Sequence, residues 1–210
     1  MVNDLRSHLC MFKYVDDCTI VEVASVSSEP SALQDELGRI NKWTIDNNIK
    51  LNISKTSVRY LFLKEPRDYL EPLSVNNQPL ETVEHIKLLG IQLSSDLKWA
   101  SHINYICTKS SKRLYALQIL KRSGVPTNDL RKMYCYFIRP VLEYDCPVWH
   151  SLLTCKLTSQ VEDIQRRSVK IIHPYLSYNK DLASLKLPML SERRESLCKS
   201  FYKTNFSSDS

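Results

Sequence analysis

The pattern of apolar and polar residues changes along the chain, from spacing typical of β-strands to spacing typical of helices. In residues 13–21, apolar and β-branched residues flank the adjacent acids Asp16 and Asp17. Aspartate tolerates the backbone angles of a tight turn, so this stretch predicts a β-hairpin with both acids at its tip. Such carboxylates can bind Mg²⁺, which prefers oxygen ligands. The alternative is a solvated turn without function, in which adjacent acids also occur.

A helical repeat follows the hairpin. Ser31, with Gln34 three residues later, is typical of a helix N-cap. Apolar residues then recur at helical spacing, at Leu33, Leu37, Ile40 and Trp43. Glu36 lies off this stripe. The pattern predicts an amphipathic helix that covers one face of a sheet and ends near residues 47–48.

Several short strands are expected next. Residues 58–63 are rich in β-branched and aromatic side chains, which predicts a strand. Residues 73–75 and 78–80, joined by two asparagines, predict a small hairpin. Residues 85–93 predict one further strand. A strand pair, a helix and then several strands indicate an α+β fold in which an antiparallel sheet packs on helices.

The later part of the chain is predicted to be helical. Residues 100–122 form one helical stripe, which Gly124 ends. Two more helices start at capping threonines, over residues 127–141 with a bend at Pro140 and over residues 154–171. We therefore expect three parts: a strand-rich domain over residues 1–98, an all-helical domain over 99–173, and a short helix with a disordered tail over 174–210.

The charge is unevenly distributed between these parts. Residues 1–100 contain 11 lysines and arginines against 14 aspartates and glutamates, a net charge of −3. Residues 101–173 contain 12 basic and 5 acidic residues, a net charge of +7. The basic second part indicates a polyanionic partner. The alternative is a set of solvated helix faces, which are common on soluble proteins.

Composition limits the class of protein. A chain of 210 residues that is 43% hydrophobic can bury a core. We expect a soluble, intracellular protein that is not secreted and does not bind a membrane, because the sequence has no long apolar run and no apolar signal near Met1. The seven cysteines are scattered without a C-x-x-C pair, as in a reducing compartment. Nuclear and cytoplasmic locations both stay open.

Zinc binding is an alternative chemistry that the spacing disfavours. Cys146, His150 and Cys155, with His173 beyond them, are candidate ligands. Their C-x₃-H-x₄-C spacing does not match the paired pattern of zinc sites. Free cysteine more often acts as a small buried apolar residue, so we expect no zinc here.

Seven short stretches, taken in order, resemble one family. They are KYVDD (13–17), LNISKT (51–56), LLGIQLSSDLKW (88–99), RPVLEY (139–144), PVW (147–149), QRR (165–167) and SERRE (191–195). Over nearly its whole length the chain resembles the reverse transcriptases of non-LTR retrotransposons of the LINE, jockey type. The resemblance implies part of the palm over residues 1–98, with the active-site hairpin and the primer-grip region, followed by a helical thumb.

The implied activity is RNA-directed DNA synthesis, in which dNTPs are added to a primer on an RNA template with two Mg²⁺ ions. By position, Asp16 resembles a direct metal ligand and Asp17 its supporting neighbour. Tyr14 would lie near the primer terminus. Lys55 matches a lysine that helps to protonate the pyrophosphate leaving group, although it also fits a solvated surface lysine.

The resemblance also implies residues that hold the nucleic acid. Residues 86–95, including Leu89 and Gly90, would hold the primer backbone. Basic side chains of the helices would grip the phosphates of the template–primer duplex, and we assign this role to Lys112, Arg113, Arg166 and Arg167.

One departure from the family limits the expected activity. Family members supply a third metal-binding aspartate from a strand far upstream, but only thirteen residues precede Tyr14. We therefore expect an incomplete metal site in this chain alone, which resembles the C-terminal half of a polymerase. Three hypotheses follow: part of an active enzyme whose N-terminal half is missing, a non-enzymatic nucleic-acid-binding remnant, or an inert fragment that aggregates through unpaired strand edges.

Overall fold

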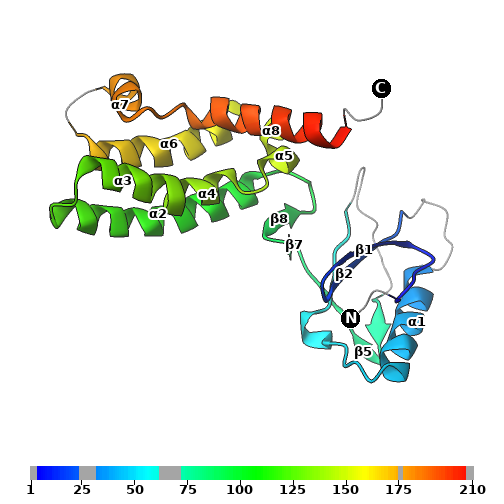
Figure 1. Cartoon of the computed structure of the whole chain (residues 1–210). Helices are drawn as coiled ribbons and strands as arrows, with labels where there is room; N and C mark the ends of the chain where they lie inside the picture. Colours follow the sequence, from blue (N-terminus) through cyan, green and yellow to red (C-terminus); the bar gives the residue numbers. More distant parts are fainter. Residues whose placement is uncertain (1–3, 24–31, 62–71, 175–176, 207–210) are drawn as a thin grey trace. The chain divides into compact units, whose positions relative to one another are not determined.

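The structure is a computed structural model that describes residues 4–23, 32–61, 72–174 and 177–206. These residues form a mixed α+β fold with two compact units, Met1–Ile86 and Lys87–Ser210 (Figure 1). We expected a boundary near residue 98, whereas the units divide between Ile86 and Lys87. The difference arises because the strand β8 (Ile91–Ser94) packs against the first long helix of the second unit.

Short strands and one long helix make up the first unit. In chain order they are β1 (Cys10–Tyr14), β2 (Asp17–Val21), α1 (Ala32–Asp46), the 3₁₀ turn η1 (Ile53–Lys55), β3 (Ser57–Val58), β4 (Ser74–Val75), β5 (Gln78–Pro79) and β6 (Glu81–Thr82). β1 and β2 form the predicted antiparallel hairpin. β4 and β5 form the second predicted hairpin, with Asn76 and Asn77 at positive φ angles of 53° and 60°, and β3 pairs with β6 in parallel.

The predicted amphipathic helix is confirmed, and it covers the small core of the first unit. The buried side chains of this core are Leu37, Val58, Leu73, Val75 and Leu80. The Gln34 amide connects α1 to β4 by two hydrogen bonds. It donates to the carbonyl of Ser74 at 3.0 Å and accepts from the Ser74 N–H at 2.9 Å. The predicted N-cap, Ser31, lies outside the described residues.

Glu36 is a correction to the helical pattern, since its side chain is buried rather than on the polar side. Its carboxylate forms an ion pair with Arg39 at 3.0 Å and accepts a hydrogen bond from the His8 N–H at 3.4 Å. These partners offset part of the cost of burying a charge. They also connect the segment before β1 to the helix.

The strands are shorter and more fragmented than the sequence predicts. Of the strand expected over residues 58–63, only Val58 pairs, in β3, and residues 62–63 lie outside the described ranges. The single strand expected over 85–93 is instead two, β7 (His85–Leu88) and β8, which turn at Leu89 and Gly90. The positive φ of 93° at Gly90 explains this turn. The described residues form four separate two-stranded sheets in place of the one antiparallel sheet that we expected.

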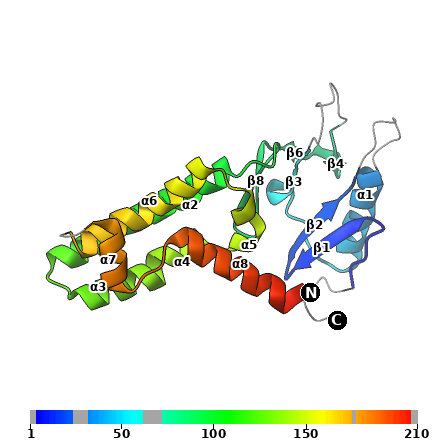
Figure 2. The ribbon, with the colours of Figure 1, turned by 90° about the horizontal axis from the view of Figure 1, so that it is seen from above.

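Helices dominate the second unit. They are α2 (Ala100–Arg122), α3 (Thr127–Met133), the π-helical η2 (Tyr134–Ile138), α4 (Arg139–Glu143), α5 (Cys146–Trp149), the 3₁₀ turn η3 (His150–Leu152), α6 (Cys155–Ile172), α7 (Tyr178–Leu185) and α8 (Leu190–Phe206). α2 and α6 lie side by side along much of their length (Figures 1 and 2). Between the helices lies an extensive core that includes Ile103, Leu117 and Trp149, all fully buried.

The helices predicted over residues 100–122 and 154–171 are confirmed as α2 and α6. The Thr154 hydroxyl accepts a hydrogen bond from the Leu157 N–H at 3.3 Å and so caps α6 as expected. Thr127, in contrast, is the first residue of α3 and makes no capping bond with its side chain. The second predicted helix is interrupted by the π-helical turn before Pro140, because proline has no N–H and its ring crowds the preceding turn.

The segment after residue 174 also differs from the prediction, because it contains two helices rather than one short one. Leu190 and Arg194 of α8 are both fully buried, so this helix is part of the core of the second unit. The guanidinium of Arg194 lies 5.7 Å from the Trp149 ring. Burial of both side chains holds α8 against the other helices. The predicted disordered end of the chain, from residue 207, lies outside the described residues.

Gly90→Ala should destabilise the second unit, because a methyl group at this positive φ would lie 3.1 Å from the Tyr144 ring. We expect the unfolding free energy to fall by about 1–3 kcal/mol, measured by urea unfolding with circular dichroism. Gly38→Ala is the matched control, because Gly38 lies in a helix with open space around it. This change should raise the unfolding free energy by about 0.5–1 kcal/mol. Equal effects of the two changes would contradict the assigned turn.

Candidate functional site

The hairpin β1–β2 presents Asp16 and Asp17 to solvent. Tyr14 pairs with Asp17, so Val15 and Asp16 alone form the turn. Val15 has a φ of 58°, which is rare for a β-branched residue. This backbone places the Asp16 carboxylate at the tip of the hairpin and the Asp17 carboxylate at the start of β2.

One face of this hairpin is apolar and uncovered. Phe12 and Tyr14 lie on the same face because they are two residues apart in β1, and they are 61% and 62% exposed. Asp17, the partner of Tyr14, shares that face. Among the described residues no third strand pairs with either edge of the hairpin, and an unpaired strand edge can pair with another segment.

Lys55 is placed near the end of a tight 3₁₀ turn and is exposed. Asn52 holds this turn, because its side chain accepts from the Ser54 hydroxyl at 2.7 Å and its carbonyl accepts from the Thr56 hydroxyl at 2.9 Å. Within the described ranges, no hydrogen bond or ion pair joins Lys55 to Asp16 or Asp17. The structure therefore does not assemble these three predicted residues into one contact group.

No metal centre is complete in the part of the chain that the structure describes. Three or more His, Cys, Asp or Glu side chains do not gather there in a way that could hold an ion. Asp16 and Asp17 are two adjacent carboxylates, fewer than the three side chains that such a group requires. The zinc candidates form no such group among the described residues. Cys155 is exposed, while His173 is paired with Asp181 at 2.7 Å.

The turn of the β7–β8 strand pair, at Leu89 and Gly90, is tied to the helices. The Tyr144 hydroxyl donates to the Leu89 carbonyl at 2.7 Å. His102 of α2 lies between the rings of Trp99 and Trp149, with centroid separations of 6.0 Å and 5.5 Å. The Nδ1 atom of this histidine accepts the backbone N–H of β8 residue Gln92 at 3.3 Å.

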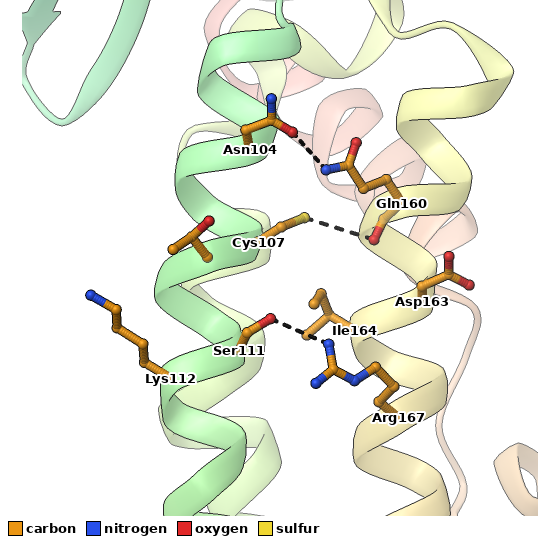
Figure 3. Close-up of a pocket in the computed structure, with 9 residues that line it drawn as sticks. Asn104, Cys107, Ser111, Lys112, Gln160, Asp163, Ile164 and Arg167 are labelled. Carbon is orange, nitrogen blue, oxygen red and sulfur yellow. Dashed lines mark hydrogen bonds between the residues drawn. The ribbon is translucent and has the colours of Figure 1, made fainter.

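A polar groove of about 610 Å³ lies between α2 and α6 (Figure 3). Its lining includes Lys112 and Arg167, two of the four basic residues predicted to hold a duplex. The Arg167 guanidinium donates to the Ser111 hydroxyl at 3.4 Å, and the Gln160 amide donates to Asn104 at 2.7 Å. The lining also includes one acid, Asp163, whose charge is paired with Arg166. Amides, hydroxyls and the two cations of the groove can bind the oxygens of a sugar–phosphate backbone.

Cys107 lines this groove, and its thiol is unreactive. Burial raises the pKa of its thiol to about 11, and its Sγ lies 3.7 Å from the carbonyl of Gln160. The thiol is therefore protonated at neutral pH. It acts as a packing residue between the two helices rather than as a nucleophile.

The other two predicted basic residues face elsewhere. Arg113 bonds to the carbonyl of Phe137 and stacks 4.3 Å from the centre of that ring. Arg166 pairs with Asp163 and lies 5.1 Å from the Tyr178 ring. Neither lines the groove, although both remain on the surface of the helical unit.

A basic cluster that the sequence analysis missed lies beside the groove. Lys87 of β7 and Lys109 of α2 both approach the ring of Tyr105, with Nζ-to-centroid distances of 5.3 Å and 5.8 Å. The i, i+4 spacing of Tyr105 and Lys109 was the available signal. The contact with Lys87 depends on tertiary structure and had no local signal.

Comparisons with known proteins identify no relative: no family model, no curated protein and no solved structure matches this chain. In the described ranges, no helix combines the length and the apolar composition that are needed to cross a membrane.

His102 should make the stability of the helical unit depend on pH. Burial lowers the pKa of this histidine below its usual 6.5. The folded state therefore disfavours protonation, and the stability present above pH 6.5 is lost as the pH falls below that value. We expect the urea-unfolding free energy to decrease from pH 7 to pH 5.

The matched variant is His102→Asn, whose amide oxygen can still accept the Gln92 N–H. It should show a smaller pH dependence than the wild type, whatever its stability at pH 7. The comparison is needed because burial and Arg194 also lower the pKa of His150, which adds a contribution of the same sign. An unchanged pH dependence in the variant would rule out His102 as a source.

Proposed function

We propose that this chain provides the aspartate hairpin and the duplex-binding helices of an RNA-directed DNA polymerase of the non-LTR retrotransposon type. The observation that carries the proposal is the hairpin itself. Asp16 and Asp17 are exposed at a two-residue turn, and the Tyr14 ring lies on the same face as Asp17. This arrangement fits the residues that resemble the family's active-site motif.

In this proposal Asp16 binds a divalent metal ion directly and Asp17 supports it. Mg²⁺ bound there would bring the incoming nucleotide's phosphates and the primer hydroxyl together. The two carboxylates are exposed and can turn toward an ion, because neither forms a hydrogen bond or ion pair with a described side chain. At least one more carboxylate must come from another segment, and the uncovered face and edges of the hairpin are suited to receive such a segment.

The test of the catalytic role is primer extension on an RNA template with Mg²⁺, using this chain joined to an upstream polymerase segment. Asp16→Asn should reduce extension by at least about 10³-fold, since a neutral amide binds Mg²⁺ poorly. Asp46→Asn, at the exposed end of α1, is the control and should leave the rate unchanged. Extension that survives in the Asp16 variant would refute the assignment.

Nucleic-acid binding without catalysis is a second candidate, favoured by the groove between α2 and α6. Lys112 and Arg167 lie on opposite helices there, and residues 101–173 carry a net charge of +7. Binding through phosphates releases counterions, so the affinity should fall steeply with salt. This role requires only the helical unit, whereas catalysis requires the hairpin as well.

Lys112→Ala and Arg167→Ala should each weaken the binding of an RNA–DNA hybrid. The loss of affinity should be about the same whatever the base sequence of the hybrid. Each should also reduce the slope of log K against log salt by about 1, because one phosphate contact is lost. Fluorescence anisotropy from 50 to 300 mM salt measures both effects. Lys180→Ala, an exposed lysine of α7, is the control. Salt-independent binding would argue against the groove as a phosphate site.

A further inference from the structure

Three side chains from two elements of the helical unit converge beside the groove. The Lys87 ammonium donates to the Tyr105 hydroxyl at 3.3 Å and also lies 5.3 Å from the centre of its ring. Lys109, one turn further along α2, lies 5.8 Å from the same ring. Two cations thus share one phenol, whose oxygen is a hydrogen-bond acceptor.

The positive charge of this cluster is not neutralised in the part of the chain that is described. Neither Lys87 nor Lys109 forms an ion pair there with any acid, and the same holds for Lys112, three residues after Lys109. Helical spacing puts Tyr105, Lys109 and Lys112 on one face of α2. The cluster is therefore continuous with the polar groove, in which Lys112 is a lining residue.

We propose that Lys87, Tyr105 and Lys109 form a binding site for one phosphate group of a nucleic-acid backbone. This inference rests on the proposed binding of nucleic acid and assigns a particular contact to it. Both lysines would donate to the phosphate oxygens, and the Tyr105 hydroxyl would donate a third hydrogen bond once Lys87 turns to the anion. A polyanion is favoured over a single carboxylate because Lys112 and Arg167 extend the positive charge into the groove, where the one acid, Asp163, is paired with Arg166.

Tyr105 supplies a direct readout of occupancy. The hydrogen bond from Lys87, together with the nearby charge of Lys109, lowers the pKa of the Tyr105 hydroxyl below its usual 10.0. A bound phosphate would take the Lys87 proton donor away and bring negative charge close to the phenol. Both changes disfavour the phenolate, so binding should raise the pKa of Tyr105.

The experiment follows the titration of each tyrosine in the full chain by NMR with ¹³Cζ-labelled tyrosine, using Tyr105→Phe to assign the signal. It is repeated with inorganic phosphate and with a short RNA–DNA hybrid. We expect the hybrid to move the titration midpoint of Tyr105 to higher pH. The midpoint of Tyr115, which is 66% exposed on the same helix, should stay unchanged. Lys87→Ala should abolish the response of Tyr105. It should also weaken hybrid binding about fivefold at 0.15 M salt, because one phosphate contact is lost. Lys180→Ala should have neither effect.

The outcomes separate this inference from the function on which it rests. If the hybrid binds with steep salt dependence but Tyr105 does not respond, the phosphate site is refuted and duplex binding stands. If phosphate moves Tyr105 but the hybrid does not, the cluster binds free anions only, and the nucleic-acid assignment is overturned. If the hybrid does not bind at all, both proposals fail.

Discussion

The helical unit depends on one buried carboxylate and the amide beside it. Glu162 of α6 accepts hydrogen bonds from the Tyr178 hydroxyl and from the backbone N–H groups of Leu190 and Ser191, the latter two at 3.3 Å. Gln165, one turn later, donates to Glu162 and accepts from the Tyr134 hydroxyl. This network joins α6 to η2, to α7 and to the first turn of α8, where a negative charge is favoured by the helix dipole. An unsatisfied carboxylate at this depth would be costly, so these elements must assemble together.

That constraint explains why the groove can serve as a binding surface. α6 is held from behind by α7 and α8, and its other side packs along α2, so Lys112 and Arg167 are presented from two fixed helices. The side chains between them are already bonded to one another across the groove. A partner with many phosphates therefore meets donors whose positions are set by the fold, which lowers the entropic cost of binding.

Local signals predicted most of the helical unit and the two small hairpins. Helical spacing and capping threonine identified α2 and α6, and adjacent asparagines identified the β4–β5 turn. Two failures have identifiable causes. Gly90 turns the chain inside a continuous apolar pattern, a local signal that the pattern outweighed. Glu36 is buried with the nearby Arg39 and with the backbone N–H of His8, and only the second of these partners is distant in sequence. The groove residues Lys112 and Arg167 were predicted as basic positions. The hydrogen bond from Arg167 to Ser111 and the approach of Lys87 to Tyr105 depend on contacts between elements that no window of sequence contains.

The two candidate functions place opposite electrostatic demands on the chain. Asp16 and Asp17 put two exposed carboxylates on one turn, and these repel phosphate unless a divalent cation lies between them. Lys87, Lys109, Lys112 and Arg167 attract phosphate without any metal ion. A contact through the hairpin must therefore depend on Mg²⁺, whereas a contact through the helices must depend on monovalent salt. In the proposed function, binding of a duplex by the helical unit does not require the metal ligands of the hairpin, whereas catalysis requires both units. A test of duplex binding can therefore succeed even where a test of catalysis fails.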